Sequence, residues 1–163
     1  MGQVFLARDT FLDRIVALKL LLTTESAASV RDRFYTEARA VARLQHPNVV
    51  TLYRAGETDG KLYLVSEYVT GKSLDREKHP MPWQRVLQLG LGIARGLAAA
   101  HQSKVLHRDI KPANVMCTDD PSQNDPENGI AATAVSVTFV PTGTSIVQFA
   151  PQFNPAGLEV TIP

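Results

Sequence analysis

The chain has 163 residues, of which 44% are hydrophobic and 20% charged, and its formal net charge is +1. This size and apolar content suit one compact globular domain, while the near-neutral charge gives no electrostatic sign of nucleic-acid or anionic-membrane binding. A single cysteine, Cys117, excludes an internal disulfide and a cysteine-rich zinc site. No stretch is long and apolar enough to span a bilayer and no signal peptide is apparent, so a cytoplasmic, soluble protein is expected.

The beginning of the chain predicts two antiparallel strands and a helix. Residues 3–7 and 15–22 are apolar runs rich in branched side chains, and the segment between them is polar, as a turn would be. Apolar residues then recur at helical spacing over residues 29–45, with charged residues on the other face. We expect the His-Pro-Asn sequence at 46–48 to end this helix, because a residue before proline avoids helical angles. The apolar face comprises Val30, Phe34, Ala38, Val41 and Ala42.

The middle of the chain predicts a second hairpin and a long helix. Residues 49–56 and 61–69 resemble strands, and the Glu-Thr-Asp-Gly sequence at 57–60 between them is typical of a turn. Residues 83–102 have the period of a helix, with an apolar stripe made of Val86, Leu89, Ile93, Leu97 and Ala100. Because strands and helices are segregated along the chain, we expect an α+β fold with a small β-rich lobe.

The chain changes character after Cys117. Residues 118–129 are rich in proline, aspartate and asparagine, which is typical of a loop or linker. The residues that follow alternate between apolar and small polar types, interrupted by prolines and glycines. We therefore assign residues 119–163 to a linker and a poorly defined tail, which forms short strands or is disordered.

Charged and polar side chains are concentrated in the sequence HRDIKPANV, at residues 107–115. It combines a carboxylate, Asp109, with the cation Lys111 and the amide Asn114, within a few positions of one another. These groups by themselves also suit a turn with solvated charges. Motif matches of this kind carry a risk of false positives, so the other segments of the chain decide between the two interpretations.

Two segments together resemble the protein kinase superfamily. The Val-Ala-Leu-Lys sequence at 16–19 is similar to the strand that carries the kinase lysine, and His-Arg-Asp at 107–109 is similar to the start of the kinase catalytic loop. The resemblance covers residues 1–118 and is to bacterial, eukaryotic-like serine/threonine kinases. It implies a protein-kinase-like fold whose antiparallel, β-rich N-lobe also contains one helix.

The resemblance also implies the division of this partial domain. The N-lobe would cover residues 1–66, the hinge residues 67–71, and the beginning of an incomplete helical C-lobe residues 72–118. The implied activity is transfer of a phosphoryl group from ATP to serine or threonine hydroxyls of a protein substrate, with Mg²⁺ as cofactor.

The resemblance implies catalytic roles for three residues of this loop. Asp109 would orient the substrate hydroxyl and accept its proton. Asn114 would hold a magnesium ion through its amide oxygen, because hard cations prefer oxygen ligands. Lys111 would neutralise charge on the transferred phosphoryl group.

Lys19 and Glu37 are the implied phosphate anchor. A lysine within an apolar run needs a partner or a route to solvent, and Glu37 lies on the predicted 29–45 helix where the family has its glutamate. Paired with Glu37, Lys19 would bind the α- and β-phosphates of ATP. The alternative is that Lys19 points outward from a half-exposed strand.

The adenine base would be bound by the hinge and by apolar side chains. The resemblance implies hydrogen bonds from backbone groups of the segment that contains Glu67 and Val69. It also implies apolar contacts above and below the base from Val4, Ala17 and Met116.

The chain departs from the kinase pattern at two places. Only Gly2 of the glycine-rich loop is present, and Glu127-Asn128-Gly129 stands where the family has Asp-Phe-Gly. Glu127 would offer its carboxylate to magnesium from a longer side chain, and Asn128 does not fill the apolar position of the phenylalanine. We therefore expect impaired activity, with two alternatives: a non-catalytic nucleotide-binding or protein-interaction module, or a kinase fragment joined to an unrelated tail.

Overall fold

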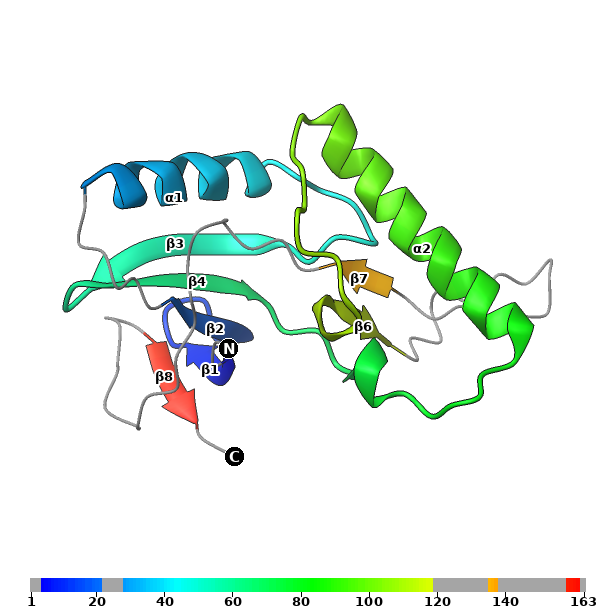
Figure 1. Cartoon of the computed structure of the whole chain (residues 1–163). Coiled ribbons are helices and arrows are strands. Elements are labelled where there is room, and N and C mark those ends of the chain that lie inside the picture. Colours follow the sequence, from blue (N-terminus) through cyan, green and yellow to red (C-terminus); the bar gives the residue numbers. More distant parts are fainter. Residues whose placement is uncertain (1–3, 22–27, 119–134, 138–157, 162–163) are drawn as a thin grey trace. The chain divides into compact units, whose positions relative to one another are not determined.

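A computed structural model describes residues 4–21, 28–118, 135–137 and 158–161 (Figure 1). The chain divides into two compact units. The first contains residues 1–42, 51–68 and 141–163, and the second contains residues 43–50 and 69–140. The second segment of the first unit ends at Tyr68, and the long segment of the second unit begins at Val69.

The first unit is built on a five-stranded sheet in the order β3-β4-β2-β1-β8. Every pairing in this sheet is antiparallel. The unit also contains the helix α1. Its elements are β1 (Val4–Asp9), β2 (Arg14–Leu21), α1 (Ala28–Val41), β3 (Leu52–Thr58), β4 (Lys61–Glu67) and β8 (Leu158–Thr161).

The two predicted hairpins are present in this sheet. β1 pairs with β2, and β3 pairs with β4. The second hairpin turns through Asp59 and Gly60, whose φ angles are 50° and 72°. Positive φ at both central residues matches the twist of the strands on either side, and glycine adopts such angles without steric penalty.

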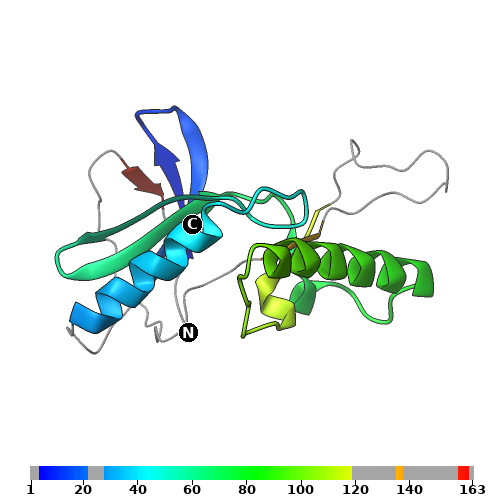
Figure 2. The same cartoon turned by 90° about the horizontal axis from the view of Figure 1, so that it is seen from above.

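Both faces of the sheet are buried around β4. On one face, a core cluster contains Ala7, Val16, Leu18, Leu20, Tyr63 and Val65. The alternate residues Leu62 and Leu64 are also buried, at 1% and 4% exposure, so the opposite face is covered too. The helix α1 runs beside β3 (Figures 1 and 2). Its buried residues are Phe34, Ala38 and Val41.

The predicted helix over 29–45 is too long at its C-terminal end. α1 ends at Val41, and Ala42, which we assigned to the apolar face, is exposed. Leu44 lies outside the helix but is only 3% exposed, and it follows Val41 at helical spacing. The apolar pattern in the sequence therefore continues past the true end of the helix. The backbone N–H of Asn48 donates to Nδ1 of His46 at 3.0 Å, so this sequence shapes the loop rather than ending the helix directly.

The second unit is built around one long helix, α2, whose bounds match the prediction. The unit also contains a three-stranded antiparallel sheet in the order β5-β6-β7. Its elements are β5 (Lys72–Ser73), η1 (Leu74–Arg76), α2 (Trp83–Gln102), η2 (Pro112–Asn114), β6 (Val115–Cys117) and β7 (Val135–Val137). The sequence after residue 118 thus contributes two short strands, β7 and β8, to the described residues.

One face of α2 packs into the core of the second unit. Leu89 forms a cluster with Val115 and Cys117, and Ile93 packs against that cluster. The predicted apolar stripe is wrong at Val86, which is 55% exposed because the buried face is centred further around the helix. Glycines take part in this face, and the buried residues of α2 are Leu89, Gly92, Gly96 and Ala100.

Among the described residues, no helix has both the length and the hydropathy needed to cross a membrane.

Candidate active site

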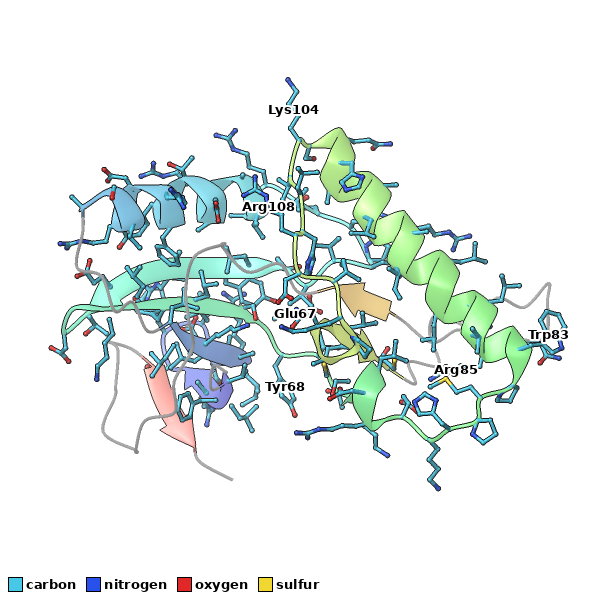
Figure 3. The ribbon with its side chains drawn as sticks, in the orientation of Figure 1. Glu67, Tyr68, Trp83, Arg85, Lys104 and Arg108 are labelled. Carbon is cyan, nitrogen blue, oxygen red and sulfur yellow. The ribbon has the colours of Figure 1, made fainter. Side chains whose placement is uncertain are left out.

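The catalytic-loop sequence is held by a buried histidine and a short 3₁₀ turn. His107 is 4% exposed, and its Nδ1 accepts a hydrogen bond of 3.2 Å from the backbone N–H of Asp109. Arg108, labelled in Figure 3, lies between them with a φ of 61°, in the left-handed region. The side chain of Asp109 itself is exposed.

The turn η2 places Asn114 next to Asp109. Pro112 is at the start of η2, where the backbone N–H that proline lacks would have no partner within the helix. The backbone N–H of Asn114 donates to the carbonyl oxygen of Lys111 at 2.9 Å. Proline thus begins a turn that brings the amide of Asn114 back toward the carboxylate.

The three predicted catalytic residues are in direct contact. The ammonium of Lys111 lies 2.7 Å from Oδ2 of Asp109. Nδ2 of Asn114 donates to the backbone oxygen of Asp109 at 2.8 Å and to Oδ2 at 3.1 Å. The structure therefore brings the three predicted residues together, while the side chains of Lys111 and Asp109 stay 52% and 58% exposed.

The contacts of this cluster lower the pKa of Asp109 overall. The hydrogen bond from Lys111 lowers the pKa of Asp109 below its ordinary value, partial desolvation acts the other way, and the hydrogen bond from Asn114 lowers it further. The charge of Lys111 adds to the lowering. An anionic carboxylate whose Oδ2 is engaged still has Oδ1 to accept a proton or a hydrogen bond.

The donor set at Asn114 suits a hard cation. Its amide nitrogen is used by Asp109, which leaves the amide oxygen as the available acceptor. The second predicted metal ligand, Glu127, lies outside the described residues, as do Gly2, Asn128 and Gly129. Within the residues that the structure describes, no group of three or more His, Cys, Asp and Glu side chains could hold a metal ion.

Val4, Ala17 and Lys19 share one face of the sheet in the first unit. The register pairs Val4 with Lys19 and Leu6 with Ala17, and directly paired residues of antiparallel strands point to the same side. The alternate residues of β2, among them Leu18, belong to the core on the other face. Val4 is 59% exposed, while Ala17 and Lys19 are half-buried.

Lys19 and Glu37 both belong to this unit. Lys19 is opposite the buried Leu64 in the β2–β4 register. Glu37 is half-buried on α1, between the buried residues Phe34 and Ala38. Their ion pair stays a prediction.

The predicted adenine-binding residue Glu67 has a structural contact that the sequence did not reveal. Its backbone N–H donates to the carbonyl oxygen of Thr51 at 2.9 Å, and its Oε2 accepts from the backbone N–H of Thr51 at 3.3 Å. The register of the β3–β4 pairing shifts nearby, between Leu52 and Arg54. The Glu67 N–H is thus occupied where β4 ends, and its carbonyl oxygen accepts a hydrogen bond of 3.4 Å from the hydroxyl of Ser66.

Met116 lies on β6 in the second unit, half-buried between the buried residues Val115 and Cys117. A neighbour of β6 that the sequence analysis missed is Gly71. A Cβ atom at Gly71 would lie 2.1 Å from the carbonyl oxygen of Cys117, so only glycine fits there. The Thr-Gly-Lys-Ser sequence at 70–73 signalled a turn but not this close approach.

Comparison with known proteins agrees with this arrangement. Residues 1–126 match the family model described as "Protein kinase domain". The chain belongs to the protein kinase family. The predicted superfamily and the protein-kinase-like, α+β fold are therefore confirmed, and the match extends past residue 118.

Bacterial serine/threonine kinases are among the similar proteins. A probable serine/threonine-protein kinase of Clostridium perfringens is 36% identical over 159 residues, which is 95% of this chain and 23% of that protein. The serine/threonine-protein kinase PknF of Mycobacterium tuberculosis is 41% identical over 128 residues, 75% of this chain and 27% of that protein. This kinase-family chain thus spans about a quarter of the length of these curated relatives.

Solved kinase domains have the same fold. The crystal structure of the Mycobacterium tuberculosis PknI kinase domain superposes with a TM-score of 0.70 and 30% sequence identity. The match covers 90% of this chain and 57% of that kinase domain. The fold of this kinase-family chain is therefore that of part of a kinase domain.

Proposed function

We propose that this chain is a serine/threonine protein kinase domain with impaired activity, which uses ATP and Mg²⁺ to phosphorylate serine or threonine hydroxyls of a protein substrate. The observation that supports this best is the contact of Asp109 with Lys111 and Asn114. That cluster combines a proton acceptor, a cation and a neutral oxygen ligand, which are the groups that phosphoryl transfer requires.

Asp109 is the proposed base. The hydroxyl oxygen of the substrate forms a bond to the γ-phosphorus, the bond from that phosphorus to the bridging oxygen of ADP breaks, and the hydroxyl proton passes to Asp109. A carboxyl with the ordinary pKa of aspartate is already ionised at neutral pH, and the lowered pKa of Asp109 leaves it so. Lys111, already 2.7 Å from Asp109, would offset charge on the transferred phosphoryl group.

The proposed metal ligands are the amide oxygen of Asn114 and the carboxylate of Glu127. Mg²⁺, when bound, would neutralise charge on the phosphates of ATP. Asn114 contributes a fixed oxygen because its nitrogen is held by Asp109. Glutamate at position 127, where the family has aspartate, is the reason for proposing impaired activity.

ATP is the proposed nucleotide ligand. Lys19, paired with Glu37, would bind its α- and β-phosphates. The exposed side chain of Val4 and the half-buried position of Ala17 support apolar contact with the base. The remaining proposed contacts of the base are Met116 and the backbone of Glu67 and Val69.

We also propose a cytoplasmic location, because ATP is the phosphoryl donor and the composition fits an intracellular protein. The similarity to the Clostridium perfringens kinase covers 95% of this chain, which argues against an unrelated tail. The main alternative is a nucleotide-binding module without catalysis, which the Glu-Asn-Gly sequence at 127–129 favours.

Two measurements on the full 163-residue chain test the proposal. Mg-ATP at 100 times its Kd should stabilise the chain by about 2.7 kcal/mol, seen as a rise in Tm. Lys19→Met should abolish this shift, whereas the exposed Lys78→Met should retain it. Asp109→Asn should retain the shift and reduce incorporation of labelled phosphate about 100-fold or more, unlike the exposed Asp75→Asn control.

The outcomes separate the alternatives. Stabilisation without incorporation in any variant would support the non-catalytic module. Incorporation that Asp109→Asn leaves unchanged, or the absence of any nucleotide effect, would contradict the proposed site. The double substitution Glu127→Asp with Asn128→Phe should raise incorporation at least tenfold if the residues at 127–129 limit the activity.

A further inference from the structure

The last residue of β4, Glu67, is held to Thr51 by its main chain and by its side chain. Its backbone N–H donates to the carbonyl oxygen of Thr51, and its Oε2 accepts from the backbone N–H of Thr51 at 3.3 Å. A carboxylate therefore takes the place of a main-chain acceptor at this position. Because hydrogen bonds to charged acceptors are stronger than those to neutral ones, the side chain of Glu67 restrains the end of β4.

A second contact joins the two strands on either side of β4. In the sheet order, β4 lies between β2 and β3. The guanidinium carbon of Arg14, on β2, nevertheless lies 3.7 Å from the centroid of the Tyr53 ring, on β3. A cation over an aromatic face at this distance is attracted by the ring, and Asp9 adds an ion pair at 3.7 Å from Nε of Arg14. The stack of Arg14 on Tyr53 therefore crosses β4.

The register places this stack on the face of the sheet that carries the side chain of Glu67. Val16 is opposite Glu67 in the β2–β4 pairing, so their side chains point to the same side. Arg14 is two residues before Val16 and shares its face. Tyr53 lies at the register shift of the β3–β4 pairing, where a strand can direct a side chain differently. Both restraints therefore act near the last residues of β4.

The backbone that is restrained here is the one proposed to bind the base of ATP. The carbonyl oxygen of Glu67 accepts from the hydroxyl of Ser66 at 3.4 Å, and a carbonyl oxygen has two lone pairs, so it can accept from a second donor. A ligand that binds to backbone groups gains affinity when these are already ordered, because less conformational freedom is lost on binding. Restraints on this backbone should therefore strengthen nucleotide binding.

We propose that Glu67 is a positioning residue for nucleotide binding. Its carboxylate, assisted by the stack of Arg14 on Tyr53, holds the end of β4 in the orientation that binds the base. This inference rests on the proposed binding of ATP and gives the side chain of Glu67 a role separate from that of its backbone. The side chain acts through Thr51 and not by contact with the nucleotide.

Hydrogen exchange of the Thr51 amide in the nucleotide-free chain tests the contact itself. Glu67→Ala should speed this exchange at least tenfold, whereas Glu67→Gln, which keeps an oxygen acceptor, should speed it less than threefold. The control is Glu57→Ala, because Glu57 is also half-buried but pairs with the side chain of Arg31 at 3.1 Å. The control should leave the Thr51 amide unaffected. Exchange that Glu67→Ala leaves unchanged would overturn the role of the carboxylate.

The Kd for Mg-ATP tests the consequence, measured well below the Tm of each variant. Glu67→Ala should raise the Kd at least fivefold, Glu67→Gln should recover most of this loss, and Glu57→Ala should have no effect. If the unsubstituted chain binds Mg-ATP and Glu67→Ala binds it equally well, the positioning role is wrong while the proposed function stands. If the unsubstituted chain does not bind Mg-ATP, the proposed function is wrong and this inference is wrong with it.

Substitutions of Tyr53 test the part given to the stack. Tyr53→Leu removes the aromatic face and should raise the Kd for Mg-ATP at least threefold, whereas Tyr53→Phe keeps a ring beneath Arg14 and should recover most of the affinity. Phe11→Leu removes an aromatic ring that is 90% exposed in the same unit and should leave the Kd unchanged. Equal Kd values for Tyr53→Leu and the unsubstituted chain would overturn the contribution of the stack.

Discussion

Asp109 combines an exposed side chain with a fixed position. The backbone holds it through Nδ1 of His107, and the side chains of Lys111 and Asn114 hold its oxygens. Exposure lets a substrate approach, while the contacts limit the orientations of the carboxylate. The same contacts make the chemistry of Asp109 depend on residues that would not react themselves.

The first prediction concerns the pKa of Asp109. Lys111→Met removes the largest cause of its lowering and should raise the pKa toward the ordinary value. A pH titration of the Asp109 carboxyl carbon by NMR measures this directly. The exposed Lys78→Met should leave the titration unchanged, and an unchanged midpoint in Lys111→Met would contradict the role given to the lysine.

The direction of the stability change follows from the same pKa. Because the pKa of folded Asp109 lies below that of the unfolded chain, its contacts stabilise the fold above the unfolded pKa. That stabilisation is lost as the pH falls through the folded pKa. Lys111→Met should therefore narrow the difference in free energy of unfolding between neutral and acidic pH, as measured by urea titrations at a series of pH values.

At the scale of elements, α2 depends on glycine where its backbone meets another segment. A Cβ atom at Gly96 would lie 2.6 Å from the backbone oxygen of Asn48, in the same unit. At Gly90, on the same helix, a Cβ atom would meet nothing within 4 Å. Position 96 therefore requires glycine because another segment of backbone lies close to it. Position 90, on the same helix, has open space where a side chain would be.

The second prediction uses these two glycines as a matched pair. Gly96→Ala should reduce the free energy of unfolding by about 1–3 kcal/mol, because the added methyl group collides with backbone that has little room to move. Gly90→Ala should raise it by up to about 1 kcal/mol, because alanine favours the helix and restricts the unfolded chain. Urea unfolding monitored by circular dichroism measures both, and equal effects would contradict the close approach at Asn48.

At the scale of the whole molecule, large apolar side chains remain exposed on a chain of low net charge. Trp83, at the first turn of α2 in Figure 3, is 70% exposed, and Leu87 and Leu91 further along the helix are 53% and 46% exposed. These residues lie at intervals of four and therefore form one stripe. A formal net charge of +1 provides little repulsion between molecules.

The third prediction is that this stripe promotes self-association. The combined Trp83→Gln and Leu87→Gln substitutions should lower the apparent molar mass at high concentration in light scattering, with little change in Tm because both side chains are exposed. Substituting Gln84 and Gln88 by serine changes the same number of residues on a polar side of α2 and should have no such effect. Association that is unaffected by the first pair would show that other surfaces dominate.

Much of the fold was predictable because it depends on local periodicity. The bounds of α2 follow from the helical period of residues 83–102, and the second hairpin follows from turn residues between two apolar runs. The catalytic cluster was predictable for a similar reason, since Asp109, Lys111 and Asn114 are close in sequence. The prediction failed at Val86 and at residues 42–45, where burial depends on packing partners that periodicity does not identify.

The sequence by itself determined the local elements and the group of catalytic residues, because these depend on contacts over a few positions. Only the tertiary structure decided which distant segments meet: Glu67 with Thr51, Gly71 with Cys117, and β8 with β1. These contacts join segments that are far apart in the sequence, so they depend on how folding brings those segments together. Local periodicity, which predicted the helices and hairpins, does not identify such distant partners.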